Sequence, residues 1–177
     1  MRLLLLAAQS VDGFITRHDQ PGSGFASAED QTHLQRTLAA CDCSIMGATS
    51  YREVRDQVRA NAAVPRLRVV MTRSPDAFTA DAIPDRLEFT AATPAAVAES
   101  LRQRGFQQCV LLGGAQIYTL FLEAGLVDEL WLTVEPRLFG QGIKLINRPA
   151  EHRLRLLATE HLSPDTLLLK YAGPRAP

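Results

Sequence analysis

An apolar segment that runs straight into two glycines is the feature that most constrains the fold of this chain. Residues 109–112 are Cys-Val-Leu-Leu, Gly113 and Gly114 follow, and a helical pattern begins at Ala115. Paired glycines let the backbone approach a ligand closely, and the first turn of a helix offers free N–H groups to a phosphate. The junction therefore predicts a strand, a tight turn and a helix that suit a phosphate-bearing cofactor. A tight turn without any ligand is the alternative.

Two other predicted strands end in similar residues. The turn after the strand at 44–46 consists of Gly47, Ala48 and Thr49, and the turn after the strand at 67–71 consists of Thr72, Arg73 and Ser74. Ligands of open α/β sheets bind outside the carboxyl ends of parallel strands, so we expect the three turns to meet there. Their N–H groups and hydroxyls suit a dinucleotide better than a metal ion. Arg73 would pair with a ribose 2′-phosphate, which favours NADPH over NADH, unless it is an ordinary solvated loop arginine.

Predicted strands and helices alternate up to residue 125, and the pattern then changes. Strands are predicted at 3–8, 44–46, 67–71, 87–90 and 109–112, and helices at 28–40, 51–58, 94–105 and 115–125. Three further strands, at 130–135, 154–161 and 166–171, have no long helix between them, and the turn at 163–165 predicts a hairpin from the last two. We therefore predict one α/β domain over residues 1–177, with a mostly parallel central sheet and an antiparallel C-terminal hairpin edge.

The composition excludes several classes of partner. Nineteen basic and nineteen acidic side chains cancel and no run of Lys or Arg is present, so a positive face for nucleic acid or for an anionic membrane is not expected. The apolar run at 3–8 is too short for a signal peptide, and three cysteines without a second cluster indicate buried thiols. The four histidines lack metal-ligand spacing. We expect a cytoplasmic protein that binds a small molecule and no metal.

Several segments, in the right order and spacing, resemble the dihydrofolate reductase superfamily. They are residues 7–15 (Ala-Ala-Gln-Ser-Val-Asp-Gly-Phe-Ile), 45–51, 112–118 and 128–133. The Ser-Val-Asp-Gly-Phe-Ile variant within the first of them, together with residues 27–30 and 136–142, is more similar to the C-terminal reductase domain of bifunctional riboflavin-biosynthesis proteins and to its stand-alone relatives. The resemblance covers nearly the whole chain and implies a dihydrofolate reductase-like three-layer fold.

This resemblance implies that NADPH lies across the ends of the strands. Ala8 and Ile15 would flank the nicotinamide. The other implied cofactor residues are Gly47, Ala48 and Thr49 at one phosphate turn, Thr72, Arg73 and Ser74 at the 2′-phosphate, and Gly113, Gly114, Ala115, Gln116, Ile117 and Tyr118 around the pyrophosphate and the nicotinamide ribose. The cofactor would supply the hydride, and the protein would supply proximity, orientation and a dry face.

The resemblance also implies a substrate side of the site. In folate reductases an acid on the first long helix binds the pterin, and a threonine on a later strand supports it. Thr133 matches that threonine, and Asp30 or its neighbour Glu29 lies near the place of the acid. We assign Asp30 as the catalytic residue, and Gln9, Ser27, Glu29 and Thr133 as substrate-binding residues. Acids in the first turn of a helix are also common partners of its dipole, which is the alternative.

Three functional hypotheses follow from these residues and the resemblance. The first is an NADPH-dependent oxidoreductase similar to 5-amino-6-(5-phosphoribosylamino)uracil reductase, with hydride transfer to the ribose carbon. The second gives the same cofactor site dihydrofolate or another small heterocycle, and the third is a non-catalytic NADPH-binding module. Phe14 stands where riboflavin reductases usually carry a basic residue, and residues 51–56 lack their Asp-Asn-Pro segment. The resemblance further implies a homodimer.

Overall fold

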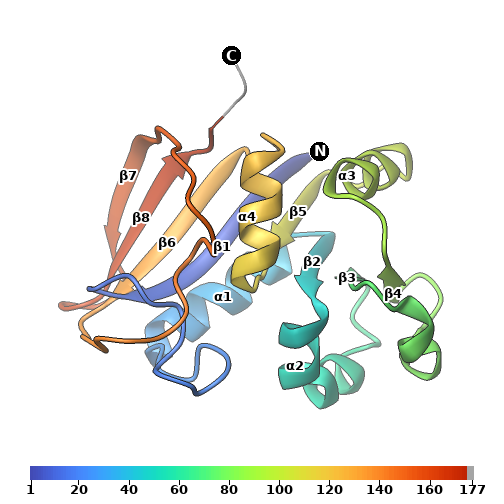
Figure 1. Cartoon of the computed structure of the whole chain (residues 1–177), viewed down its shortest axis with the longest axis horizontal. Helices are drawn as coiled ribbons and strands as arrows, with labels where there is room; N and C mark the ends of the chain where they lie inside the picture. The colour runs from blue at the N-terminus through green and yellow to red at the C-terminus, as the bar shows by residue number, and fades with distance from the viewer. Residues whose placement is uncertain (175–177) are drawn as a thin grey trace.

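The computed structural model describes residues 1–174 and is built on one mixed sheet of eight strands (Figure 1). In sequence order the strands are β1 (Arg2–Ser10), β2 (Cys43–Gly47), β3 (Leu67–Met71), β4 (Leu87–Thr90), β5 (Gln108–Leu111), β6 (Glu129–Glu135), β7 (Arg155–His161) and β8 (Leu167–Ala172). Their spatial order is β4-β3-β2-β5-β1-β6-β8-β7. Every pairing from β4 to β6 is parallel, whereas β8 pairs antiparallel with β6 and with β7. The predicted parallel sheet with an antiparallel hairpin edge is confirmed.

Helices cover both faces of this sheet. They are α1 (Ala28–Ala40), α2 (Ala48–Ala60), the 3-10 helix η1 (Pro75–Asp81), α3 (Pro94–Gln103) and α4 (Ala115–Glu123). Leu101 of α3 and Phe121 of α4 pack on the strand residues of one face, while Leu34 and Leu38 of α1 pack on the alternate residues of the other. Tyr51 of α2 and Phe78 of η1 join the core of that second face. The three-layer arrangement implied by the resemblance is confirmed, with α4 in front of β1 and β5 in Figure 1.

Local sequence signals explain where several helices begin and end. The hydroxyl of Ser27 accepts a hydrogen bond from the Asp30 N–H at 3.2 Å and caps α1. Thr93 caps α3 in the same way, and a proline occupies the first turn of that helix, where its missing N–H is not needed. Gly105 has a φ of +85°, the left-handed conformation that glycine adopts without strain after a helix. The predicted helix start at residues 93–94 is thereby confirmed.

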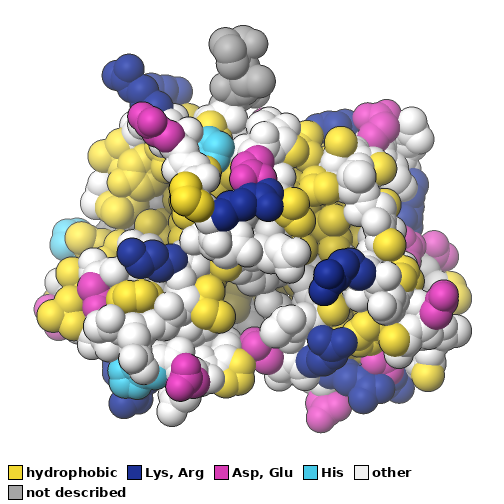
Figure 2. Space-filling view, viewed as in Figure 1, with side chains coloured by type: hydrophobic (Ala, Val, Ile, Leu, Met, Phe, Trp, Pro, Cys, Tyr) yellow, Lys and Arg dark blue, Asp and Glu magenta, His cyan; other side chains and the backbone are white. Residues whose placement is uncertain are grey.

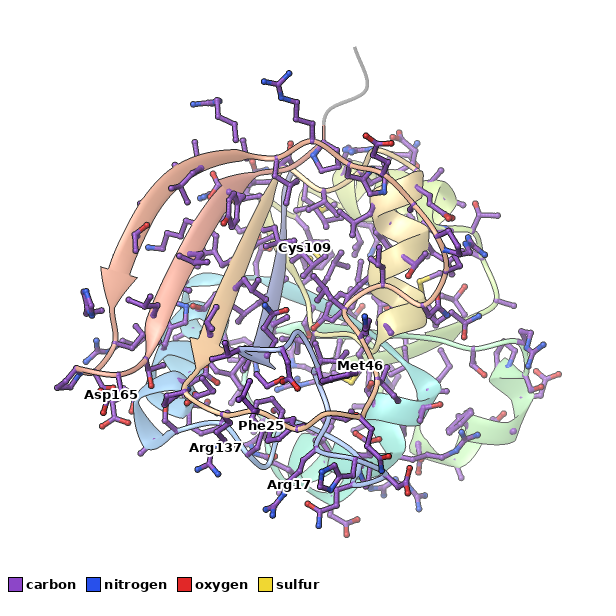
Figure 3. The ribbon with its side chains drawn as sticks, turned by 60° about the vertical axis from the view of Figure 1, so that its left-hand side comes forward. Arg17, Phe25, Met46, Cys109, Arg137 and Asp165 are labelled. Carbon is purple, nitrogen blue, oxygen red and sulfur yellow. The ribbon has the colours of Figure 1, made fainter. Side chains whose placement is uncertain are left out.

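Some details differ from the sequence prediction. Helix α2 begins at Ala48 rather than at residue 51, and Gly47 acts as its N-cap without a side-chain hydrogen bond. The 3-10 helix η1 was not predicted, because its seven residues after Ser74 are too few to show helical periodicity. The three cysteines are free and buried, as predicted, and Figure 3 shows Cys109 inside the molecule beside α4. None of the helices in residues 1–174 is both long and apolar enough to cross a membrane.

A buried carboxylate ties α2 to η1. Asp81, whose side chain is 4% exposed, accepts hydrogen bonds from Arg55 Nε at 2.7 Å, from Arg59 Nη1 at 2.6 Å and from the Tyr51 hydroxyl at 3.0 Å. The Arg55 guanidinium is the main cause that holds the pKa of Asp81 below its usual value, and the Tyr51 hydroxyl and Arg59 add to it. This network fixes the position of two elements that flank the carboxyl ends of β2 and β3.

Asp81→Asn is expected to destabilise the fold at neutral pH. It should also make the free energy of unfolding depend less on pH in the acid range. Breaking a buried ion pair costs about 3–5 kcal/mol, and half-exposed arginines reduce the expected loss to about 2 kcal/mol. Because the folded pKa of Asp81 is lowered, its contribution is present above the unfolded pKa of about 3.9 and is lost as pH falls through the folded value. Urea unfolding measured across the acid range tests both effects. The exposed pair Glu88–Arg104 provides a control, since Glu88→Gln should cost less than about 1 kcal/mol.

Candidate active site

A cleft of about 1130 Å³ lies at the carboxyl ends of the parallel strands. Its lining includes the ends of β2, β3 and β4 and the turn after β5, and it continues between the inner sides of α1 and α2, where Leu38 and Val58 line it. The hollow below α4 in Figure 2 belongs to this region. Because the sheet is open and its strands are parallel here, this is the place where ligands of α/β proteins bind.

Two helix N-termini open onto the cleft where the predicted turns meet. Gly47 is the N-cap of α2 and Gly114 is the N-cap of α4, and neither position has a side-chain cap. The Gly47 N–H donates to the Gly113 carbonyl oxygen at 2.7 Å, which holds the two turns together. The free N–H groups in the first turns of both helices, together with the positive ends of their dipoles, favour an anionic ligand.

The glycines at this junction are required by the space around them. Gly113 has a φ of +97°, and a Cβ at this position would lie 2.9 Å from the Cζ atom and the hydroxyl of Tyr118. A Cβ at Gly47 would lie 3.1 Å from Cγ1 of Ile117. The peptide bond between Gly113 and Gly114 is cis. A side chain larger than hydrogen at either position would press on Tyr118 or Ile117, so the two turns need glycine to keep their shape.

The third predicted turn lies at the same cleft. Thr72, Arg73 and Ser74 all line it, and the Ser74 N–H donates to the Thr72 hydroxyl at 3.2 Å. Arg73 is exposed and forms no ion pair with any residue in the described part of the chain. Lys and Arg side chains gather at the lower right of Figure 2, over α2 and the segment after β3. This side of the cleft therefore offers positive charge and hydroxyls to an anion.

On the other side of the cleft lies a buried acid. Asp30 is 7% exposed and lines the cleft from the first turn of α1. Burial raises the pKa of Asp30, the charge of Glu135 raises it further, and the Thr133 hydroxyl lowers it. That hydroxyl interacts with Asp30 electrostatically but makes no hydrogen bond of standard geometry with a described residue. A carboxyl with a raised pKa keeps its proton to higher pH than an exposed aspartate does, and this suits a proton donor.

Tyr118 connects the cofactor side with the acid. Its ring is buried, and its hydroxyl donates to the Leu6 carbonyl oxygen at 2.7 Å. Burial, with a smaller effect from the charge of Asp30, raises the pKa of Tyr118 far above its usual range, so its phenol stays protonated. The Tyr118 side chain therefore lies in a fixed position between the glycine turn and Asp30.

The structure brings most of the predicted site residues to one cleft. Those that line it are Ala8, Ile15, Asp30, Gly47, Ala48, Thr49, Thr72, Arg73, Ser74, Gly114, Ala115, Gln116, Ile117 and Tyr118. Gly113 does not line the cleft but lies next to Tyr118. Thr133 is buried and stands beside Ala8 in the register of β1 and β6. No ligand role is tested by this placement, and each assignment stays a prediction.

The remaining substrate-binding predictions do not line the cleft. Gln9 is half-buried on β1, and Glu29 is exposed on the outer side of α1. The Ser27 hydroxyl already caps α1 and donates to Glu135 at 2.9 Å. Between the two neighbouring acids, burial therefore favours Asp30 over Glu29 as the acid of the site.

Sequence reasoning missed three charged residues near the cleft. Arg66 and Arg68 line it, although both lie at the amino-terminal end of β3 and not in a recognisable motif. Glu135 is the last residue of β6 and is 1% exposed. Its signal was present, because alternate residues of a strand share a face and Glu135 lies two positions after Thr133.

Comparison with known proteins decides the family. The model of the family described as the RibD C-terminal domain matches residues 2–168. The chain belongs to this family. The RibD C-terminal domain fold is the riboflavin-biosynthesis reductase-like, dihydrofolate reductase-like fold expected from the resemblance, and that expectation is confirmed.

Relatives and solved structures of similar shape extend along almost the whole chain. The uncharacterised protein YwjB of Bacillus subtilis is 25% identical over 162 residues, which cover 90% of this chain and 91% of YwjB. A pyrimidine reductase-like protein of Corynebacterium diphtheriae has a TM-score of 0.75 at 18% identity, with 99% of this chain and 92% of that chain covered. The deaminase/reductase of Thermotoga maritima has a TM-score of 0.74 at 15% identity, and 97% of this chain covers 56% of that protein.

Proposed function

We propose that this RibD-family domain is an NADPH-dependent reductase whose substrate resembles 5-amino-6-(5-phosphoribosylamino)uracil. The observation that carries the proposal is that Asp30 and the three predicted cofactor turns line one continuous cleft. Two proteins of similar structure, a pyrimidine reductase-like protein and a phosphoribosylaminouracil reductase, support this class of substrate.

The residues of the cleft fit a nicotinamide dinucleotide. Gly47 and Gly114 line the cleft without a side chain, and the uncapped first turns of α2 and α4 would offer N–H groups to phosphates. Thr72, Arg73 and Ser74 would hold the 2′-phosphate. Bound NADPH would supply a hydride. Ala8 and Ile15, both apolar, would help to keep water from the transfer.

In this proposal Asp30 supplies the proton that accompanies the hydride. Reduction of the C=N bond in the ring-opened ribosylamine requires a hydride at the ribose carbon and a proton at the nitrogen. Asp30 holds a proton to higher pH than an ordinary aspartate because it is buried, and it faces the cleft. Its carboxyl oxygen would give that proton to the substrate nitrogen and recover it from solvent after product release.

Two arginines at the far end of the same cleft favour an anionic substrate. Arg68 is 3% exposed, and within residues 1–174 its side chain donates only to the carbonyl oxygens of Asn61 and Arg66, at 2.9 and 2.8 Å. Arg66 donates to the Leu38 carbonyl oxygen at 2.7 Å, and its Nε is buried without a partner among the described residues. Burial lowers the pKa of both guanidinium groups. Charges without a carboxylate partner in this region are suited to a phosphate or a carboxylate of the substrate.

A second candidate keeps the cofactor site and changes the substrate. The pairing of Asp30 with Thr133 corresponds to the acid and threonine that bind the pterin in folate reductases, so dihydrofolate or another small heterocycle is the alternative. A third candidate, a non-catalytic NADPH-binding module, predicts tight cofactor binding without turnover.

Substrate assays that follow NADPH absorbance distinguish the three candidates. The protein is assayed with the phosphoribosylaminopyrimidine, with its dephosphorylated form and with dihydrofolate. We expect turnover with the first and a much higher KM with the second. Oxidation of NADPH only with dihydrofolate would reject the proposal in favour of the second candidate, and binding of NADPH without any turnover would favour the third.

Arg73→Ala is expected to weaken NADPH binding without affecting NADH binding. A charged hydrogen bond to the 2′-phosphate contributes about 1.5–3 kcal/mol, so the NADPH Kd should rise by about 10- to 150-fold. Isothermal titration with both cofactors measures this. Arg153→Ala, which removes an exposed arginine that does not line the cleft, should change neither Kd. Equal losses for NADPH and NADH would contradict a 2′-phosphate role for Arg73.

The homodimer and the cytoplasmic location stay predictions. The outer strand β7 exposes Leu156 and Leu157, and an uncovered edge strand of this kind offers a surface for pairing. Light scattering of the purified protein at several concentrations would test for the dimer.

A further inference from the structure

Glu135 is a buried carboxylate held by three donors. It lies at the end of β6 and is 1% exposed. Its Oε1 accepts from the Ser27 N–H at 2.8 Å and from the Ser27 hydroxyl at 2.9 Å, and its Oε2 accepts from the Thr166 hydroxyl at 3.4 Å. Among the described residues no Lys, Arg or His forms an ion pair with it. Its charge is therefore stabilised by neutral donors and by the amino-terminal end of α1.

The same serine links Glu135 to the acid of the site. The Ser27 hydroxyl donates to Glu135 and accepts from the Asp30 N–H at 3.2 Å. Thr133 and Glu135 are two residues apart on β6, so both face α1. Figure 3 shows this end of the sheet, where the loops that carry Phe25 and Arg137 meet. One carboxylate thus connects the end of β6 with the first turn of α1, and Thr166 adds a contact from the segment before β8.

We propose that Glu135 is a positioning residue for Asp30: anchored by Ser27 and Thr166, it fixes the first turn of α1 against β6 and places a second carboxylate beside Asp30. The inference rests on the proposed role of Asp30 in reduction. Burying a carboxylate costs free energy even when three donors surround it. Capping of α1 does not require Glu135, because the Ser27 hydroxyl caps the helix by itself.

The charge of Glu135 gives this placement a chemical consequence. The groups that face Asp30 are the Thr133 hydroxyl and Glu135 from β6 and the Tyr118 phenol from α4. Tyr118 is neutral, so Glu135 is the negative charge among these groups. It adds to the effect of burial in raising the pKa of Asp30. Asp30 therefore keeps its proton at a pH where an exposed aspartate has lost it.

Carboxylate ¹³C NMR of the ligand-free protein tests the inference without any substrate. Glu135→Gln keeps an oxygen acceptor for Ser27 and removes the charge, so the Asp30 titration midpoint should move to lower pH. Glu129→Gln removes a charge from the same strand, where Glu129 pairs with Arg2, and should leave the Asp30 midpoint unchanged. An unchanged midpoint in folded Glu135→Gln protein would overturn the inference.

Ser27→Ala provides a second variant if Glu135→Gln does not fold. It breaks the link between Glu135 and the Asp30 N–H, so Asp30 should become more exposed and its midpoint should again move to lower pH. An unshifted midpoint in folded Ser27→Ala protein would then overturn the inference. With an accepted substrate, the alkaline limb of the kcat profile should move to lower pH in Glu135→Gln. A shifted Asp30 titration in a protein that turns over no substrate would support the positioning role and reject the proposed function.

Discussion

Asp30→Asn is expected to lower kcat for the accepted substrate by about 100- to 10,000-fold, the usual contribution of a positioned general acid. The amide has nearly the shape of the carboxyl but has no proton to give at neutral pH. Asp30 lies on the α1 side of the cleft, away from the turns predicted to hold the phosphates, so the Kd of NADPH should not change. Stopped-flow or steady-state assays with NADPH, together with cofactor titration, measure both quantities.

The same variant is expected to be at least as stable as the wild type at neutral pH. A carboxyl whose folded pKa is raised contributes stability below its unfolded pKa and loses it as pH rises through the folded value. Burial raises the pKa of Asp30, so ionising this carboxyl costs folding free energy, a cost that Asn does not bear. Urea unfolding of Asp30→Asn therefore shows whether a lower kcat reflects lost chemistry or lost folding stability. Glu29→Gln tests whether the neighbouring acid has this role instead. A comparable loss of kcat in Glu29→Gln, together with an active Asp30→Asn variant, would contradict the role of Asp30.

Sequence patterns predict the sheet well where a strand is buried on both faces. The strand predicted at 67–71 coincides with β3 (Leu67–Met71), all of whose residues are buried. The start of α2 was placed three residues late, because its N-cap is Gly47, which gives no side-chain capping signal. The order β2-β5-β1-β6 could not be read from any single segment. It depends on crossovers between strands far apart in the sequence, and the structure supplies it.

The candidate site also contains residues that the sequence predicts and residues that it does not. The glycine junction and the turn at 72–74 were predictable, because backbone conformation and a helix start are local properties of the chain. Arg66 was not predictable, and for Glu135 the spacing from Thr133 indicated only the face of the strand and not its partner, because the residues that contact both side chains lie far away in sequence. Arg66 reaches the Leu38 carbonyl and Glu135 reaches Ser27, so their roles depend on how α1 packs on the sheet.

Gly113→Ala is expected to cost about 3 kcal/mol of folding stability and to abolish tight cofactor binding. The left-handed backbone at Gly113 costs a residue with a Cβ about 1–2 kcal/mol. The Cβ would also lie 2.9 Å from Tyr118, and such overpacking costs about 1–3 kcal/mol. Tyr118 is buried and its hydroxyl is bonded to Leu6, so its ring can move only by breaking that bond. Urea unfolding measures the stability, and NADPH titration measures the binding.

Gly105→Ala separates the cost of the left-handed backbone from the cost of the contact with Tyr118. Gly105 has a similar φ of +85°, but a Cβ there would meet no atom within 4 Å. This variant should therefore show the backbone cost alone, about 1–2 kcal/mol, and normal NADPH binding. The difference between the two variants is the cost of displacing Tyr118. If Gly113→Ala is no less stable than Gly105→Ala and binds NADPH normally, Tyr118 does not fix the glycine turn, and the turn is not the close-approach site of the cofactor.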